Sequence, residues 1–191
     1  MKNPIHPIIF LPENTPVLDL SNGEDPLRKP GDWGIGKYNE KRLGLYTTEL
    51  FQGTRNIHMG IDLAGPVGTP IHSFDEGLLL FAAYNSAAGD YGATLVTEHM
   101  FQGKKLFALW GHLSMSSLRG KEAGQKISRG ELIAWIGDET ENGGWDRPHL
   151  HFQLSWVNPG KCDMPGVVSD NDREQALSIY PDPRMVLGPI Y

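Results

Sequence analysis

The sequence has little cysteine, no long apolar run and no excess of basic charge, and each absence excludes a class of protein. Cys162 is the only cysteine among the 191 residues, so neither an intramolecular disulfide nor a thiolate cluster for structural zinc can form. Any bound metal must therefore be held by His, Asp or Glu side chains. The formal net charge is −6 and the basic residues are scattered, so we expect no nucleic-acid partner.

Apolar stretches in the chain are short. The run from Ile8 to Leu11 is bounded by Pro7 and Pro12, and no small-residue cleavage site follows it. No stretch approaches the roughly 18 apolar residues of a membrane span, so we expect no membrane insertion. As written, the sequence predicts a cytoplasmic protein, and a periplasmic or secreted one if a leader has been removed.

Composition divides the chain into three parts. Residues 1–45 are rich in Pro, Gly and Asn and have little periodicity, which is typical of an irregular arm or a partly disordered tail. Residues 46–160 carry short runs with β character. Residues 161–191 form a second arm, in which one short helix is predicted from Asp170 to Leu177. We expect a single domain with both arms packed on its central part.

Six short apolar runs follow residue 69, and turn residues or glycines bound them. Their β-branched and aromatic residues, together with their regular spacing, predict a mainly β fold of the sandwich or barrel kind. The runs are TPIHSF, GLLLFAAY, ATLVTEH, KKLFALWGHLS, ELIAWIG and HLHFQLSW.

The histidines are the main candidates for catalytic or metal-binding residues. We expect three of the seven to be structural or solvated, namely His6, His72 and His99. The four in compact polar surroundings are His58, His112, His149 and His151. Because His149 and His151 are two residues apart in a β-type run, their side chains project from the same face and share one site.

His58 and Asp62 are four residues apart, so their side chains converge in an extended chain and also in a helical turn. This spacing is common and means little by itself. Combined with the histidine pair it becomes more specific, because two histidines and one carboxylate satisfy the three protein ligands of a catalytic zinc. The unligated imidazole could then serve as a base or as a donor to a developing oxyanion.

Four motifs, in this order, resemble the zinc metallopeptidases of the lysostaphin and LytM type. They are HMGIDLAGPVGTPIHSFDEG, WGHLS, GQKISRGELIAWIG and RPHLHFQ, and together they extend over about residues 55 to 157. The resemblance implies an antiparallel β-sheet groove with a barrel-sandwich hybrid portion of the duplicated hybrid motif type. It makes residues 46–160 the metallopeptidase domain, flanked by the two irregular arms.

The resemblance also implies roles for individual residues. His58, Asp62 and His151 correspond to the ligands of one zinc ion per chain, and His112 and His149 correspond to catalytic histidines that are not ligands. The implied reaction is hydrolysis of a peptide bond by attack of zinc-bound water. The implied partner is a peptide or peptidoglycan-like substrate that contains Gly or D-Ala.

Two features separate this chain from the general pattern. Lysostaphin-type enzymes have a tyrosine shortly before the first ligand that helps to hold the transition state, whereas this chain has Phe51 and Gln52 there; Tyr46 and Arg55 are the candidates for that role. The flanking segments are also similar to the peptidase module of bacterial proteins fused to a kinase-like and a class III aminotransferase-like domain. These segments are PVLDLS, GIGKYNEKRL, ENGGWDRPHLHFQ and YPDPRMVLG.

Two alternatives to a cell-wall peptidase stay open. One is a non-catalytic, zinc-binding regulatory module, and the other is a zinc hydrolase of an amide outside the cell wall. The presence of all five polar site residues favours an enzyme. Among the tryptophans we expect Trp110 and Trp156 in the core, and Trp145, within ENGGWDRP, at the border of the substrate cleft.

Overall fold

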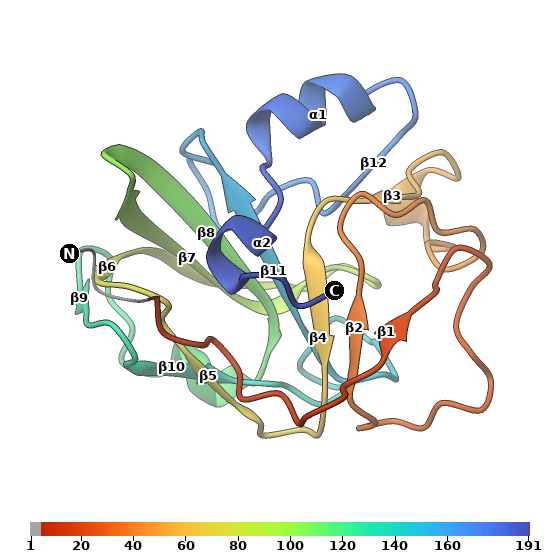
Figure 1. Cartoon of the computed structure of the whole chain (residues 1–191), viewed down its shortest axis with the longest axis horizontal. Coiled ribbons are helices and arrows are strands. Elements are labelled where there is room, and N and C mark those ends of the chain that lie inside the picture. The colour runs from red at the N-terminus through yellow and green to blue at the C-terminus, as the bar shows by residue number, and fades with distance from the viewer. Residues whose placement is uncertain (1–4) are drawn as a thin grey trace.

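The computed structural model describes residues 5–191, which form one large β-sheet with two small sheets and short helices around it (Figure 1). The strands of the large sheet are β1 (Val17–Leu18), β2 (Gly34–Gly36), β4 (Ile61–Ala64), β6 (Gly77–Asn85), β7 (Gly92–Phe101), β8 (Lys104–Leu113), β9 (Lys126–Ile127) and β11 (His149–Ser155). Their order across the sheet is β1-β2-β4-β11-β8-β7-β6-β9. One small sheet pairs β3 (Ile57–His58) with β12 (Val167–Val168), and the other pairs β5 (Pro70–His72) with β10 (Leu132–Trp135).

The prediction of a mainly β, antiparallel fold is confirmed. All strand pairs are antiparallel except β1 with β2. The six runs predicted from the sequence correspond to β5, β6, β7, β8, β10 and β11. Within residues 5–191 the large sheet stays open between β1 and β9, so no closed barrel forms.

Alternation along β11 separates a core face from a polar face. Leu150, Phe152 and Leu154 are fully buried in the main hydrophobic core, where Phe152 packs against Trp110. Because successive side chains of a strand point to opposite faces, His151 must project from the other side of the sheet. A register slip of one residue would exchange the two faces, so burial of the apolar residues fixes the direction of the histidine.

A β-bulge in β8 redirects His112. Ala93 of β7 pairs with Leu113, and Leu95 pairs with Trp110, so two residues of β8 face one residue of β7. The two residues of β8 at the bulge are Gly111 and His112, and the backbone φ of His112 is 63°. Bulges bend the strand and re-aim side chains, which explains why His112 departs from simple alternation.

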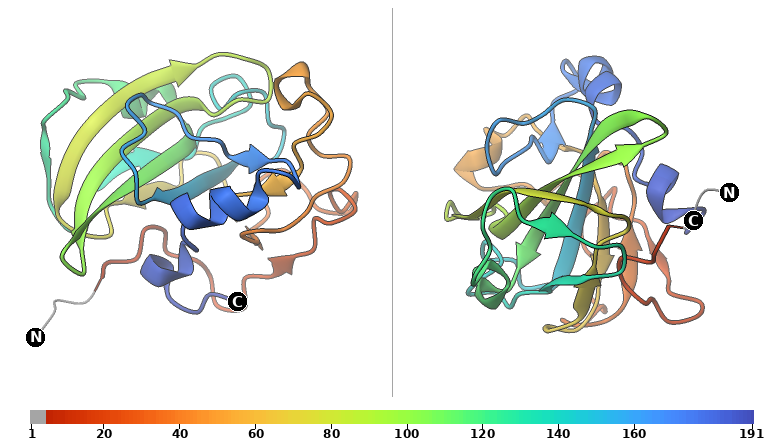
Figure 2. Two further views of the ribbon diagram at one scale, coloured as in Figure 1. Left: turned by 90° about the horizontal axis from the view of Figure 1, so that it is seen from above. Right: turned by 90° about the vertical axis from the view of Figure 1, so that its left-hand side faces the viewer.

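The segments predicted as arms pack on the central part, and the first of them contributes β1 and β2 to the large sheet itself. The N-terminal segment buries Ile8 and Ile9 in the main core, while residues 1–4 of the predicted arm lie outside the described residues. In the C-terminal arm, β12 completes a small sheet with β3, and the two helices α1 (Arg173–Ile179) and α2 (Arg184–Leu187) follow. The structure thus confirms a helix near the predicted residues 170–177 and adds α2. Figure 2 shows α2 and the C-terminal end of the chain beside the N-terminal segment.

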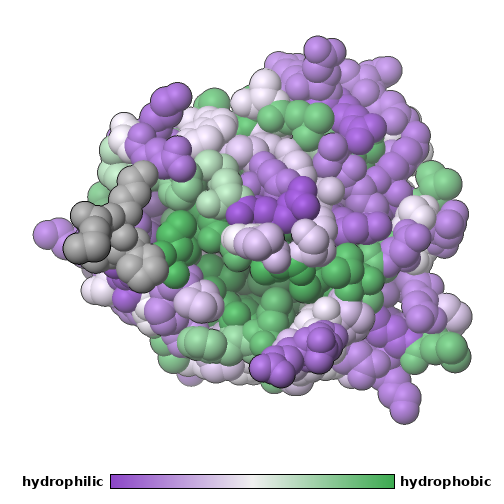
Figure 3. Space-filling view, in the orientation of Figure 1, coloured by the Kyte–Doolittle hydropathy of each residue, from purple (hydrophilic) through white to green (hydrophobic). Residues whose placement is uncertain are grey.

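One surface of the molecule is apolar and slightly hollowed, between the N-terminal segment and α2 (Figure 3). Its lining includes Ile8, Ile9, Leu63, Val186 and Ile190. None of the helices in residues 5–191 has the length and apolar character needed to cross a bilayer.

Gly60, in the turn between β3 and β4, leaves room for a site residue. A Cβ atom at this position would lie 2.6 Å from the ring of His151 and 2.8 Å from the carbonyl oxygen of Phe152. Carbon atoms do not approach this closely, so any larger residue must displace the histidine or the backbone of β11.

We therefore predict that Gly60→Ala destabilises the fold by about 1–3 kcal/mol, the usual cost of overpacking a buried position. Chemical denaturation followed by tryptophan fluorescence measures this free energy. The same change should cost less in a His151→Ala background, because the crowded ring is then absent. An equal cost in both backgrounds would show that the contact with His151 is not the cause.

Candidate metal centre

Three side chains from three strands converge on the polar face of the sheet. They are His58 at the end of β3, Asp62 in β4 and His151 in β11, and His151 pairs in register with Asp62. The Oδ1 atom of Asp62 lies 3.1 Å from Nε2 of His58 and 3.1 Å from Nδ1 of His151, and these two nitrogens are 3.0 Å apart. All three residues are buried.

Hydrogen bonds on the outer side of each ring decide where the ring protons lie. Nδ1 of His58 donates to the carbonyl oxygen of Lys37 at 3.0 Å, because a carbonyl can only accept. Nε2 of His151 lies 3.0 Å from Oε1 of Gln153. The Gln153 amide nitrogen donates to the carbonyl of Pro165, so its Oε1 is the atom that accepts from His151.

The inner nitrogens therefore carry lone pairs that face each other and a carboxylate. Two lone pairs at 3.0 Å repel one another unless a cation or a proton lies between them. Burial lowers the pKa of His58 to about 4, which disfavours the proton. Burial opposes ionisation of Asp62, but its interactions with His58 and Arg42 outweigh this effect and hold the pKa of Asp62 well below its usual value.

This donor set fits a metal ion. His58, Asp62 and His151 each offer one ligand atom, and these atoms lie within 4.8 Å of one another. Two neutral imidazoles and one carboxylate form the kind of ligand set that zinc uses in catalytic sites, where a fourth position stays open. The predicted trio is therefore brought together in a geometry that could hold such an ion.

The other two predicted histidines lie beside the trio. Nδ1 of His149 donates to the carbonyl of Arg147 at 2.7 Å, and its Nε2 is 3.9 Å from Oδ1 of Asp62. Nδ1 of His112 donates to the carbonyl of Asn142 at 2.7 Å. The His112 and His149 rings are 4.3 Å apart between centroids. Burial lowers the pKa of both imidazoles, so each is neutral and its Nε2 is an acceptor.

All five predicted residues open onto one cleft of about 520 Å³. Trp145 lines this cleft, with its ring 5.8 Å from His112 and 6.0 Å from His149. Its position at the border of the cleft was predicted from the sequence. Trp110 is fully buried, as predicted, and Trp156 packs against the core as a partly buried residue.

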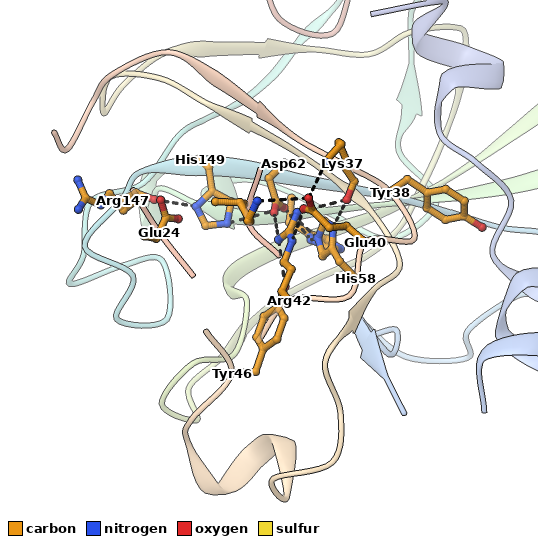
Figure 4. Close-up of polar contacts among 12 residues, drawn as sticks. Glu24, Lys37, Tyr38, Glu40, Arg42, Tyr46, His58, Asp62, Arg147 and His149 are labelled. Atoms are coloured by element: carbon orange, nitrogen blue, oxygen red, sulfur yellow. Dashed lines mark hydrogen bonds and ion pairs between the residues drawn. The ribbon is translucent and has the colours of Figure 1, made fainter. Parts of the chain in front are cut away.

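Sequence reasoning missed Arg42, whose buried guanidinium donates to Oδ2 of Asp62 at 2.7 Å. It also bonds Glu40 and the hydroxyl of Tyr46, each at 3.0 Å. Figure 4 shows Arg42 among these three side chains. Arg42 and Glu40 occur in a segment that reads as an irregular arm, so only their charge, within an otherwise unpatterned stretch, could have drawn attention to them.

Four residues that precede His58 differ in their exposure and contacts: Tyr46, Phe51, Gln52 and Arg55. Tyr46 lines the cleft, and its ring lies 4.9 Å from that of the buried Phe51. Arg55 also lines the cleft, but its guanidinium donates to the carbonyl of Leu50. Gln52 is exposed, in a left-handed conformation at the end of the short 3₁₀ helix η1 (Glu49–Phe51).

The remaining histidines lie outside the cleft, as expected. His99 is buried, and its ring bonds Thr97 and the carbonyl of Glu76. His6 and His72 form a small aromatic cluster with Phe10.

Known proteins are similar to this chain in sequence and in fold. The chain is 32% identical over 126 residues to the peptidoglycan DD-endopeptidase ShyA of Vibrio cholerae, covering 64% of this chain and 26% of that protein. It is 32% identical over 116 residues to the DD-carboxypeptidase/endopeptidase Mpg of Neisseria meningitidis, covering 59% of this chain and 24% of that protein. The chain thus spans about a quarter of the length of these relatives.

Among solved structures, the catalytic domain of lysostaphin from Staphylococcus simulans is similar in fold, with a TM-score of 0.53 and 23% identity. The similarity covers 82% of this chain and 93% of that domain. The model of peptidase family M23 matches residues 56–163, more than half of the chain and the part that contains the five predicted site residues. The chain belongs to peptidase family M23.

Proposed function

We propose that this protein is a zinc-dependent metalloendopeptidase that hydrolyses a peptide bond in cell-wall-type peptides containing Gly or D-Ala. The observation that carries the proposal is the pair of inner lone pairs on His58 and His151, 3.0 Å apart beside the Asp62 carboxylate. Membership of a peptidase family and the similarity to peptidoglycan endopeptidases support the substrate class.

In the proposed site, Nε2 of His58, Oδ1 of Asp62 and Nδ1 of His151 would hold the zinc ion. When bound, zinc supplies Lewis acidity that polarises a carbonyl and lowers the pKa of a water molecule. The protein contributes the fixed orientation of the three ligands, because each outer nitrogen or oxygen already has a hydrogen-bond partner.

His149 and His112 are proposed to move the protons. Each neutral ring presents Nε2 as an acceptor, so it can take a proton from an attacking water and later return it to the leaving amine. The carbonyl oxygens of Arg147 and Asn142, which accept from the Nδ1 atoms, also stabilise the imidazolium that forms. The closer ring, His149, is the better candidate for the base, since its Nε2 is 3.9 Å from the Asp62 carboxylate.

Tyr46 is proposed to stabilise the developing oxyanion. Its hydroxyl oxygen accepts a hydrogen bond from Arg42, which leaves the hydroxyl proton free for an oxygen atom in the cleft. Burial raises the pKa of Tyr46 to about 12, so the phenol keeps that proton at neutral pH. Arg55 is the weaker candidate, because its guanidinium is engaged with the Leu50 carbonyl.

Three finer predictions accompany this function. The chain is proposed to be divided into an arm (1–45), a metallopeptidase domain (46–160) and a second arm (161–191). Its nearest kin are proposed to be the peptidase modules of the kinase-like and aminotransferase-like fusion proteins. A cell-wall substrate would place its action in the periplasm or outside the cell, and a cytoplasmic location would restrict it to precursors or imported fragments.

The two histidines of β11 should respond differently to substitution. His151→Ala should lose both zinc and peptide cleavage, whereas His149→Ala should keep zinc and lose at least about 10²-fold in kcat, because it removes only proton transfer. Zinc per chain is measured by elemental mass spectrometry, and cleavage by mass spectrometry of defined glycine and D-alanine peptides, with and without a chelator. His72→Ala, outside the cleft, serves as the control. Loss of zinc in His149→Ala but not in His151→Ala would reverse the assignment.

Tyr46→Phe should lower kcat by about 10²-fold with little change in KM and no change in zinc content, because it removes a donor needed only in the transition state. Tyr84→Phe, at an exposed tyrosine of β6, is the matched control. If Arg55→Met lowers kcat and Tyr46→Phe does not, the oxyanion donor is Arg55.

A further inference from the structure

The side chain of Arg42 connects most of the polar groups behind the cleft. Its Nη1 donates to Oδ2 of Asp62 at 2.7 Å and to the Tyr46 hydroxyl at 3.0 Å. Its Nε donates to Oε2 of Glu40 at 3.0 Å, and its Nη2 to the carbonyl of Lys37 at 3.3 Å. The side chain is only 3% exposed, so these contacts are made without competition from water.

These contacts restrict which carboxylate oxygen of Asp62 can bind a metal. A carboxylate has two equivalent oxygens and can bind a metal through either or both. Arg42 engages Oδ2, which leaves Oδ1 as the oxygen that faces His58 and His151, 3.1 Å from each. The Lys37 carbonyl accepts from both Arg42 and Nδ1 of His58, so the same guanidinium adjoins the outer side of a second ligand.

The charges around Arg42 balance. A lone guanidinium next to a metal site would repel the cation. Glu40 pairs with Arg42 at 3.0 Å and with Lys37 at 2.9 Å. The side chains of Lys37, Arg42, Glu40 and Asp62 therefore carry no net charge together, so the guanidinium adds no net repulsion of a cation at the site.

The backbone also makes room for an arginine here. A Cβ on Gly36 would lie 2.8 Å from Nη2 of Arg42 and 3.2 Å from the Asp62 side chain. A lysine has a single ammonium and cannot reproduce the planar fork that reaches Asp62, Tyr46 and Glu40 together. Both the space and the contact geometry are thus specific to a guanidinium.

We infer that Arg42 is a positioning residue that presents Oδ1 of Asp62 to the metal and the Tyr46 hydroxyl to the substrate through a single guanidinium. The inference rests on the proposed zinc site. It couples metal affinity to the geometry of the oxyanion donor, because Nη1 serves both Asp62 and Tyr46.

The test compares wild-type protein with Arg42→Lys and Arg42→Met. Zinc affinity is measured by competition with a chromophoric chelator, and the ligand geometry by the visible absorption of the cobalt-substituted protein. We expect zinc binding to weaken about 10- to 100-fold in both variants, the usual effect of losing a partner of a metal ligand. The cobalt spectrum should shift, and kcat should fall more than KM changes.

Arg129→Met is the matched control. Arg129 also pairs with a carboxylate, donating to Oδ1 of Asp75 from Nε at 2.8 Å and from Nη2 at 2.7 Å. It does not line the cleft. Its loss should leave zinc affinity, the cobalt spectrum and kcat unchanged. Thermal unfolding of the metal-free proteins shows whether each variant is folded, and Arg42→Lys, which keeps the charge, decides the question if Arg42→Met does not fold.

The outcomes separate the inference from the function on which it rests. If the wild-type protein binds no zinc, the proposed function fails. If the wild type binds zinc and folded Arg42→Lys binds it equally well with the same cobalt spectrum, the inference about Arg42 is overturned. Weaker zinc binding and a shifted spectrum in Arg42→Lys, with an unchanged Arg129→Met control, support it.

Discussion

The arrangement of the cleft depends on hydrogen bonds that point away from it. Each of its four imidazoles has one ring nitrogen bonded to a fixed oxygen, three of them backbone carbonyls and the fourth the side-chain oxygen of Gln153. Since a neutral imidazole carries only one N–H, this contact forces the other nitrogen to present a lone pair to the cleft. These four oxygens therefore set which nitrogen of each ring carries the proton, and the inward-facing nitrogens are left to bind a cation or accept a proton.

Such an arrangement carries an electrostatic cost. His58 and His151 hold their lone pairs 3.0 Å apart in a buried site, and the Asp62 carboxylate adds a charge to the same small volume. Burial lowers the pKa of His58, so a proton between the two rings is disfavoured. Functional sites commonly retain unfavourable local contacts that the surrounding fold compensates. Here the compensation comes from the fully buried core on the opposite face of β11 and from the neutral group around Arg42.

The arms contribute to the site as well as to stability. Lys37 and Arg42 precede the strand that carries His58, yet Lys37 supplies the outer contact of His58 and Arg42 that of Asp62. The C-terminal arm provides β12, which pairs with β3 and so fixes the strand that carries His58. In addition, the carbonyl of Pro165 orients the Gln153 amide that bonds His151. The groups that position the three predicted ligands therefore come from both sides of the matched family region.

Alternation and spacing in the sequence were sufficient to predict six strands and the shared face of His149 and His151, because a strand with Leu150, Phe152 and Leu154 on one side has only one way to bury them. The trio of His58, Asp62 and His151 followed from ligand chemistry and a family resemblance. The sequence could not reveal the bulge that turns His112 toward the cleft, since one extra residue in β8 is visible only in its pairing with β7. Nor could it reveal Arg42, whose role depends on a fit among Asp62, Glu40 and Tyr46. Local periodicity determines which face a side chain occupies, whereas contacts between distant segments decide which atom of that side chain meets its partner, and only the tertiary structure fixes those contacts.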